Sequence, residues 1–276
     1  MAVMQSMVRK QYTDWIHGQL HSRGVFPKQA EKPTIVCLHM SPKSGRTYHQ
    51  VLPLLANNRI AIAPDYPGMG ESSPPPADPH VTISDYADAV WQVVDELAPG
   101  PVHFLGYHTG CMVAAEAASK RPEQSLSIAS LSAPVFTDEE TAELHETYAP
   151  LLLDESGSRF QIMWQRILRH RGPGMTLEMA ATSLAENLRG GEDYEWGHRA
   201  AFNYVPTYRQ RLAELDLPVF VLNPKDDCWT HTPRADALLK NGRRQDFPEW
   251  GHGLLDAHTT DFASVVMPFF EEHDHD

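Results

Sequence analysis

The segment LGYHTGCM, Leu105–Met112, combines an apolar run with two glycines that flank a histidine. Gly106 and Gly110 each lie two residues from His108, and glycine permits the sharp turn that leads from a strand directly into a helix. Such a turn projects its central side chain outward. The segment therefore predicts a strand, then an imidazole at the apex of a turn, then a helix.

Short apolar runs bounded by turn residues lie on both sides of this segment. They cover residues 33–39, 59–63, 126–134 and 217–224, with a weaker run near 244–248. Runs of this kind are typical of strands buried on both faces. Residues 82–98 carry apolar side chains at helical spacing after an N-cap at Thr82 or Ser84. Residues 12–24 alternate loosely, which predicts an antiparallel hairpin.

This alternation of strands and helices predicts an α/β fold, with a mostly parallel central sheet and helices on both faces. The order is interrupted once, because residues 137–215 contain no convincing buried strand and look helical. We expect residues 1–136 and 216–276 to form one core domain and residues 137–215 to form an inserted helical cap, or lid. Long insertions of this kind usually cover a pocket.

Composition excludes several classes of protein. The chain has 276 residues and a net charge of −13, which argues against non-specific binding to nucleic acid. Its three cysteines are far apart and form no CxxC pair, so neither a disulfide framework nor a thiolate zinc site is predicted. No apolar run is long enough for a membrane span or signal peptide, so we expect a cytoplasmic protein without membrane contact. The tail EEHDHD is expected to be solvated.

Unusual polar residues follow the predicted strands, where ligands bind in open parallel sheets. The segments concerned are His39–Pro42, Asp65–Gly70, Gly106–Gly110, Asn223–Asp227 and Glu249–Asp256. These segments are therefore expected to meet at one edge of the sheet.

Over nearly its whole length the chain resembles the α/β-hydrolase superfamily. Gly106-Tyr107-His108-Thr109-Gly110 is similar to its nucleophile elbow, and the loop after His39 is similar to its oxyanion loop, with Met40 in place of a glycine. The run from Asp65 to Ser72 fits the loop D-x-x-G-x-G-x-S. The aspartates of NPKDD and His252 follow in the family's order. The chain is identified as an atypical member, because His108 stands where the nucleophilic serine is usual.

The resemblance implies the roles of individual residues. His108, Asp226 and His252 are the expected catalytic residues, with Asp227 as the alternative acid. The backbone N–H groups of Ser41 and Thr109 are the expected oxyanion hole, which a change of the side chain at position 108 leaves in place.

Three uses of the His108 imidazole are open. It could attack a substrate directly, act as general base together with His252, or only position a substrate. We expect it to project into a closed pocket, within hydrogen-bonding reach of His252 directly or through one water. The hydroxyl of Ser41 could be a displaced nucleophile, or it could bond its own backbone before Pro42.

A metal centre is a less favoured alternative. His39, His108, His252 and Asp226 could converge as imidazole and carboxylate ligands, but no H-x-H or H-x-x-x-H pair fixes them locally. We expect no metal. No cofactor is expected either, since no Gly-x-Gly-x-x-Gly or phosphate loop follows a strand.

Several apolar side chains are candidates for binding a substrate. Met40, Tyr107 and Trp164 are the expected contacts, and the cap could add Met163, Met175, Met179 and Trp196 or keep them as its own small core. Cys111 is expected to pack behind the turn.

The resemblance implies hydrolysis of an ester, or of a carbon–carbon bond next to a carbonyl, in a small and partly apolar substrate. Two alternatives stay open: a cofactor-free lyase or isomerase that uses histidine as base, and a ligand-binding member of the fold without catalysis. The expected partner is a small molecule, and a homo-oligomer is possible.

Overall fold

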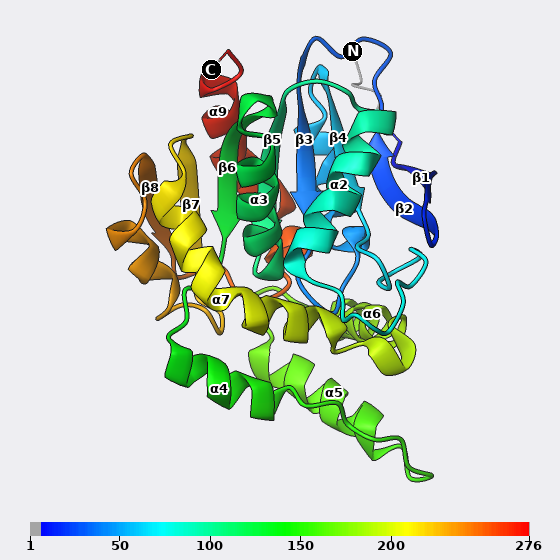
Figure 1. Ribbon diagram of the computed structural model, residues 1–276. Coiled ribbons are helices and arrows are strands. Elements are labelled where there is room, and N and C mark those ends of the chain that lie inside the picture. Colours follow the sequence, from blue (N-terminus) through cyan, green and yellow to red (C-terminus); the bar gives the residue numbers. More distant parts are fainter. Residues whose placement is uncertain (1–6, 276) are drawn as a thin grey trace.

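The computed structural model describes residues 7–275, which form one eight-stranded sheet with helices on both faces (Figure 1). The order of strands is β1-β2-β4-β3-β5-β6-β7-β8. The strands are β1 Arg9–Trp15, β2 Gly18–Val25, β3 Lys32–Leu38, β4 Arg59–Pro64, β5 Val102–Tyr107, β6 Ser125–Leu131, β7 Val219–Pro224 and β8 Gly242–Phe247. Strands β3 to β8 pair in parallel, whereas β1 and β2 form an antiparallel hairpin that joins β4. The predicted fold class is confirmed.

The buried strands of the structure coincide with the apolar runs of the sequence. β5 and β7 are buried at every position, because helices cover both of their faces. β8 is the edge strand, and most of its side chains are exposed or half-buried, which explains its weak apolar signal.

Helices pack on both faces of the sheet. The core helices are α1 Leu52–Leu55, α2 Ile83–Leu97, α3 Thr109–Lys120, α8 Leu254–Ala257 and α9 Thr259–Glu272. Helices α2 and α3 belong to one buried apolar cluster, and α1, α8 and α9 contribute to a second cluster. Thr82 caps α2, as its sequence predicts, because its hydroxyl accepts from the N–H of Asp85. No helix of the described residues is long and apolar enough to cross a bilayer.

Four helices lie between β6 and β7. They are α4 Asp138–Thr147, α5 Ser158–His170, α6 Leu177–Leu188 and α7 Trp196–Glu214. Figure 1 shows α4 and α5 beyond the ends to which the arrows of β3 and β6 point. Helices α4 and α5 therefore lie at the edge of the sheet where the polar loops meet, whereas α7 contributes to the buried cluster that contains α2 and α3.

The C-terminal segment is anchored at Asp274, contrary to the prediction of a solvated tail. The Asp274 carboxylate accepts from Arg59 Nη1 at 2.7 Å and Nη2 at 2.9 Å, and Arg59 is completely buried on β4. A buried guanidinium needs an opposite charge, so the end of the chain folds back to supply it.

Candidate active site

His108 occupies the apex of a strained turn between β5 and α3. Its backbone has φ 48° and ψ −113°, a conformation in which a bulky side chain is rare. The two glycines make this turn possible. A Cβ on Gly106 would lie 2.4 Å from the carbonyl oxygen of Gly110, and a Cβ on Gly110 would lie 1.9 Å from that of Leu38. The structure thus has the turn that the glycine spacing predicts.

Asp226 holds the imidazole of His108. The distance from His108 Nε2 to Asp226 Oδ2 is 3.0 Å. The same oxygen accepts from Ser132 Oγ at 2.5 Å, and Oδ1 accepts from the backbone N–H of Cys228 at 2.9 Å. Three donors therefore fix a carboxylate whose side chain is fully buried. Burial raises the pKa of Asp226, but the neighbouring His108 lowers it, and the net pKa is below its ordinary value.

Asp227, not Asp226, holds His252. Asp227 Oδ1 lies 2.7 Å from His252 Nε2, and His252 Nδ1 lies 3.4 Å from the hydroxyl of Tyr107. The family resemblance favoured Asp226 as the acid of His252. The structure instead gives each histidine its own carboxylate, because consecutive side chains in the loop after β7 point in different directions.

The two imidazoles share one site. Their ring centroids are 5.4 Å apart, and Asp227 Oδ1 is also 3.7 Å from His108 Nε2. Asp227 therefore bridges the rings. Burial lowers the pKa of His108, but Asp226 and Asp227 outweigh that effect, and the net pKa lies above its ordinary value.

A cavity of about 540 Å³ lies beside these pairs, and His108, Asp227 and His252 are part of its wall. Met40 and Tyr107 line it from the core side, and Met163, Met175 and Met179 line it from α5, from α6 and from the loop between them. The backbone of the insert also reaches the site, because Gly172 N donates to His252 O at 3.0 Å.

Trp164 does not line the cavity, and its prediction as a substrate contact is wrong. Arg169 and four further residues of α5 line the cavity, and the four are Met163, Arg166, Ile167 and His170. They repeat at intervals of three and four, which defines one face of a helix. Trp164 is one position off that face and is half-buried elsewhere. Trp196 likewise packs against the core beside α2 and α3.

A second cavity of about 50 Å³ adjoins His108 and is lined by Ser41, Thr109 and Cys228 among others. Thr109 is the first residue of α3, so its N–H has no partner within the helix. The two residues predicted for the oxyanion hole thus border one small space next to the imidazole.

The hydroxyl of Ser41 is buried and has no hydrogen-bond partner among the described residues. It lies against Gly197 of α7, where an added Cβ would come within 2.2 Å of it. Neither hypothesis for this hydroxyl fits: it bonds neither histidine and does not bond its own backbone.

His39 does not join the other histidines, as the less favoured metal hypothesis would require. His39 is buried, its Nδ1 donates to Met40 O at 2.9 Å, and its Nε2 accepts from Tyr66 N at 3.2 Å. Burial lowers its pKa, in keeping with a neutral ring. A different group of donor atoms, from His108, Asp226, Asp227 and Cys228, lies within 4.8 Å of one another. Within that group Asp226 is a hydrogen-bond partner of His108 and of the backbone N–H of Cys228, whereas Asp227 bonds to His252, which lies outside the group.

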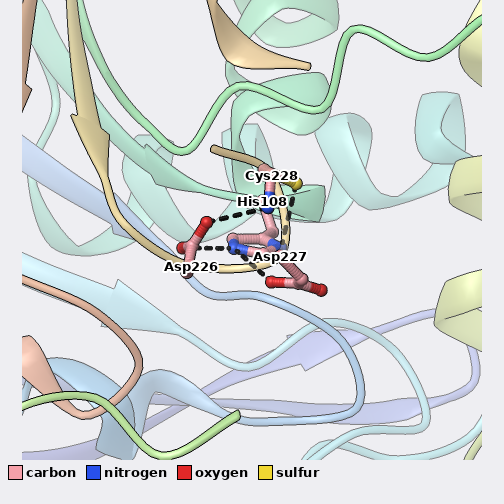
Figure 2. A group of neighbouring side chains, drawn as sticks. All are labelled: His108, Asp226, Asp227 and Cys228. Atoms are coloured by element: carbon pink, nitrogen blue, oxygen red, sulfur yellow. Dashed lines mark hydrogen bonds and ion pairs between the residues drawn. The ribbon is translucent and has the colours of Figure 1, made fainter. Parts of the chain in front are cut away.

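Cys228 was missed by sequence reasoning. Its sulfur lies 3.8 Å from His108 Nδ1, whereas Asp226 lies at Nε2 (Figure 2). The two contacts are thus on the two different nitrogens of one ring. Cys111, by contrast, packs behind the turn as predicted, with its sulfur 3.3 Å from the carbonyl oxygens of Gly106 and Leu131.

Lys43, also missed, ties the loop after β3 to α6. Its Nζ donates to the carbonyl oxygen of Ser183 at 2.8 Å and to the hydroxyl of that residue at 2.6 Å, and it contacts Asn187. Burial lowers the pKa of Lys43 to about 7, against the opposing effect of Glu186. The charge that strengthens these hydrogen bonds is therefore lost as the pH rises through about 7.

We expect Lys43→Met to raise KM about tenfold, because the loss of these hydrogen bonds loosens α6 over the cavity. The native enzyme should show a rise in KM as the pH increases through about 7, and the variant should not. Steady-state kinetics across that range test this, with the exposed Lys240→Met as control. A native KM that does not depend on pH would contradict it.

Known proteins share this architecture. A protein family described as alpha/beta hydrolase fold matches residues 33–165. Proline iminopeptidase from Lactobacillus helveticus is 24% identical over 279 residues, covering 90% of this chain and 92% of that protein. The acetyltransferase component of the acetoin cleaving system of Cupriavidus necator is 30% identical over 224 residues, covering 77% of this chain and 56% of that protein.

Solved structures are similar over nearly the whole chain. An esterase from Exiguobacterium antarcticum has a TM-score of 0.76 at 17% identity and covers 95% of this chain and 100% of its own. A hydrolase from Pseudomonas aeruginosa has a TM-score of 0.77 at 20% identity, with 95% and 98% covered. The chain therefore has the α/β-hydrolase fold. In this chain His108 occupies the turn between β5 and α3, and the site contains the two histidine–aspartate pairs.

Proposed function

We propose that the protein is a hydrolase that cleaves an ester, or a carbon–carbon bond next to a carbonyl, with His108 as general base in place of a serine nucleophile. The observation that carries this proposal is the double pair His108–Asp226 and His252–Asp227 beside a large cavity. Similarity to an esterase, a hydrolase and a peptidase supports the reaction class.

The base is His108, oriented by Asp226. When Nε2–H donates to the carboxylate, Nδ1 carries the lone pair and can accept the proton of an attacking group. A raised pKa makes this nitrogen a stronger base than free imidazole. The negative charge that develops on the substrate oxygen is stabilised by the backbone N–H groups of Ser41 and Thr109.

His252 with Asp227 supplies a second imidazole on the same site. Because Asp227 contacts both rings, it stabilises whichever of them carries a proton. His252 is therefore suited to hold Asp227 beside His108 while His108 carries a proton. Tyr107 at its other nitrogen fixes the orientation of the ring.

The inserted helices act as a cap that selects the substrate. The cavity is large enough for a small molecule, and the methionines from α5 and α6 and the loop between them give it a deformable apolar wall. Arg166 adds a polar contact, since it lies over the ring of Tyr148 at 5.5 Å and borders the cavity. We expect a partly apolar substrate with one polar end.

A cofactor-free lyase or isomerase is the second candidate, because a histidine base without a hydroxyl nucleophile equally suits removal of a proton next to a carbonyl. Analysis of the reaction products distinguishes a hydrolase from a lyase or isomerase. A lyase or isomerase exchanges substrate protons with deuterated water without consuming a water molecule, whereas a hydrolase incorporates oxygen from labelled water into the acid product.

The test of the hydrolase is a series of p-nitrophenyl esters of increasing acyl length. We expect turnover of the shortest esters, and we expect His252→Ala to lower kcat by about tenfold or more because Asp227 loses the partner that holds it beside His108. The exposed His145→Ala is the matched control. Absence of turnover with every ester, together with tight binding of a small molecule, would favour a non-catalytic receptor instead.

A further inference from the structure

We propose that the group activated by His108 is the thiol of Cys228, so that the site contains a Cys228–His108–Asp226 triad and forms a thioester intermediate. The proposal rests on the proposed hydrolase function and names its nucleophile. It places a sulfur nucleophile on the loop after β7 instead of at the elbow.

The contacts have the order that a triad requires. Cys228 Sγ is 3.8 Å from His108 Nδ1, and His108 Nε2 is 3.0 Å from Asp226 Oδ2. A base must lie near the nucleophile at one nitrogen and be oriented by a carboxylate at the other. The backbone fixes Cys228 firmly, because its N–H donates to Asp226 Oδ1 and its carbonyl accepts from His231 and Thr232.

The small cavity supplies the place for the reacting carbonyl. Cys228, His108, Ser41 and Thr109 all border it, so the thiol and the expected oxyanion donors face one space of about 50 Å³. Ser41 is 7% exposed, and its buried hydroxyl, which has no partner among the described residues, is an independent sign of a bound polar group. A substrate oxygen in this cavity would give it one.

The environment of the thiol determines how it reacts. Cys228 is 1% exposed, and burial raises its pKa, so a free thiolate does not accumulate. Proton transfer to His108 must therefore accompany attack, as it does for serine. This explains why the imidazole needs the nearby carboxylates that raise its own pKa.

The chemical steps balance with water as the only second substrate. His108 Nδ1 takes the proton of Cys228 while sulfur bonds to the ester carbonyl carbon. The carbon–oxygen bond then breaks, and the imidazolium protonates the alkoxide. Water next attacks the thioester, His108 accepts its proton, the carbon–sulfur bond breaks, and the proton returns to sulfur.

The two cavities also predict which part of the ester is small. The acyl group must enter the space of about 50 Å³, which is about a tenth of the volume of the larger cavity. The leaving group faces the cavity of about 540 Å³. Acetyl esters should therefore be preferred over hexanoyl esters of the same alcohol.

The experiment is rapid acid quench of the protein mixed with p-nitrophenyl acetate, followed by intact-mass measurement and peptide mapping. The native protein should gain one acetyl group on Cys228, with one equivalent of p-nitrophenolate released in a burst. Cys228→Ala should lose the adduct, the burst and at least about 100-fold in kcat/KM. His108→Ala should slow acetylation of Cys228 by a similar factor. Cys37→Ala, a buried cysteine of β3, is the control and should behave like the native protein.

The failures are distinguishable. If Cys228→Ala keeps native kcat/KM, the thiol is not the nucleophile, and the hydrolase proposal survives with water as the attacking group. If Cys228→Ala is inactive but the native protein never carries the adduct, Cys228 is structural and the inference is overturned. If no ester is turned over, the hydrolase proposal fails. In that case, stoichiometric acetylation of Cys228 that is faster than acetylation of Cys37 would still support Cys228 as a nucleophile. Equal acetylation of the two cysteines, or none, would overturn the inference.

Discussion

Replacing His108 by alanine should lower kcat/KM for the best short ester about 10²- to 10⁴-fold, the range that a positioned general base contributes. The variant removes the imidazole that Asp226 orients and leaves the oxyanion N–H groups in place, so binding should change less than kcat. Alanine keeps the Cβ, so the backbone at φ 48° stays strained, and loss of the contact with the buried Asp226 carboxylate should make the folded state less stable than the native one.

The matched control is His145→Ala, since His145 is an exposed residue of α4 that borders neither cavity. His108→Ser is a sharper comparison, because it recreates the elbow motif Gly-x-Ser-x-Gly. We expect it to be as impaired as the alanine variant. Both nitrogens of His252 already face Asp227 and Tyr107, so neither is directed at a serine hydroxyl. A His108→Ala variant with native turnover would refute the role of His108 as base.

Asp226→Asn should lower kcat about 10²-fold or more and shift the pH profile to lower pH. A general base must be unprotonated, so kcat/KM rises as the pH passes the pKa of His108. Asp226 raises that pKa by its charge and its hydrogen bond. Removal of the charge lowers the pKa, and the acid limb of the profile must move down with it. Asp226→Asn also weakens the hydrogen bond that keeps the proton of His108 on Nε2.

The measurement is kcat/KM between about pH 5 and pH 9 for native, Asp226→Asn and Ser132→Ala proteins. Ser132→Ala removes one hydrogen bond from the carboxylate but keeps its charge, so its acid limb should stay close to that of the native enzyme. An upward shift of the limb in Asp226→Asn would show that the titrating group is not His108.

Most of the fold could be predicted because its signals are local. The apolar run before His108, the two glycines around it and the capped helix after Thr82 each depend on neighbours in sequence. Buried parallel strands can also be recognised in the sequence, because they are continuous apolar runs. Their carboxyl ends must meet at one edge of the sheet, and this is why the segments around His108, Asp226 and His252 converge as expected.

The pairing inside the site could not be predicted in the same way. Asp226 and Asp227 are adjacent, and only the turn after β7, where Asp226 N donates to Pro224 O, decides which carboxylate faces which ring. The same turn places Cys228, two residues after Asp226, beside His108. Trp164 is one position after the cavity-facing Met163. In a mostly polar helix the sequence alone could not show which of the two side chains faces the cavity.

The most direct measurement of the central claim is ¹⁵N NMR titration of histidine-labelled native protein, with His108 assigned by its loss in His108→Ala. Nitrogen shifts report the protonation of each ring nitrogen separately. A ring oriented by Asp226 for catalysis should carry its proton on Nε2 and leave Nδ1 free above its pKa, and that pKa should lie above the ordinary histidine value. A proton on Nδ1, or a pKa below the ordinary value, would contradict His108 as the base of this site.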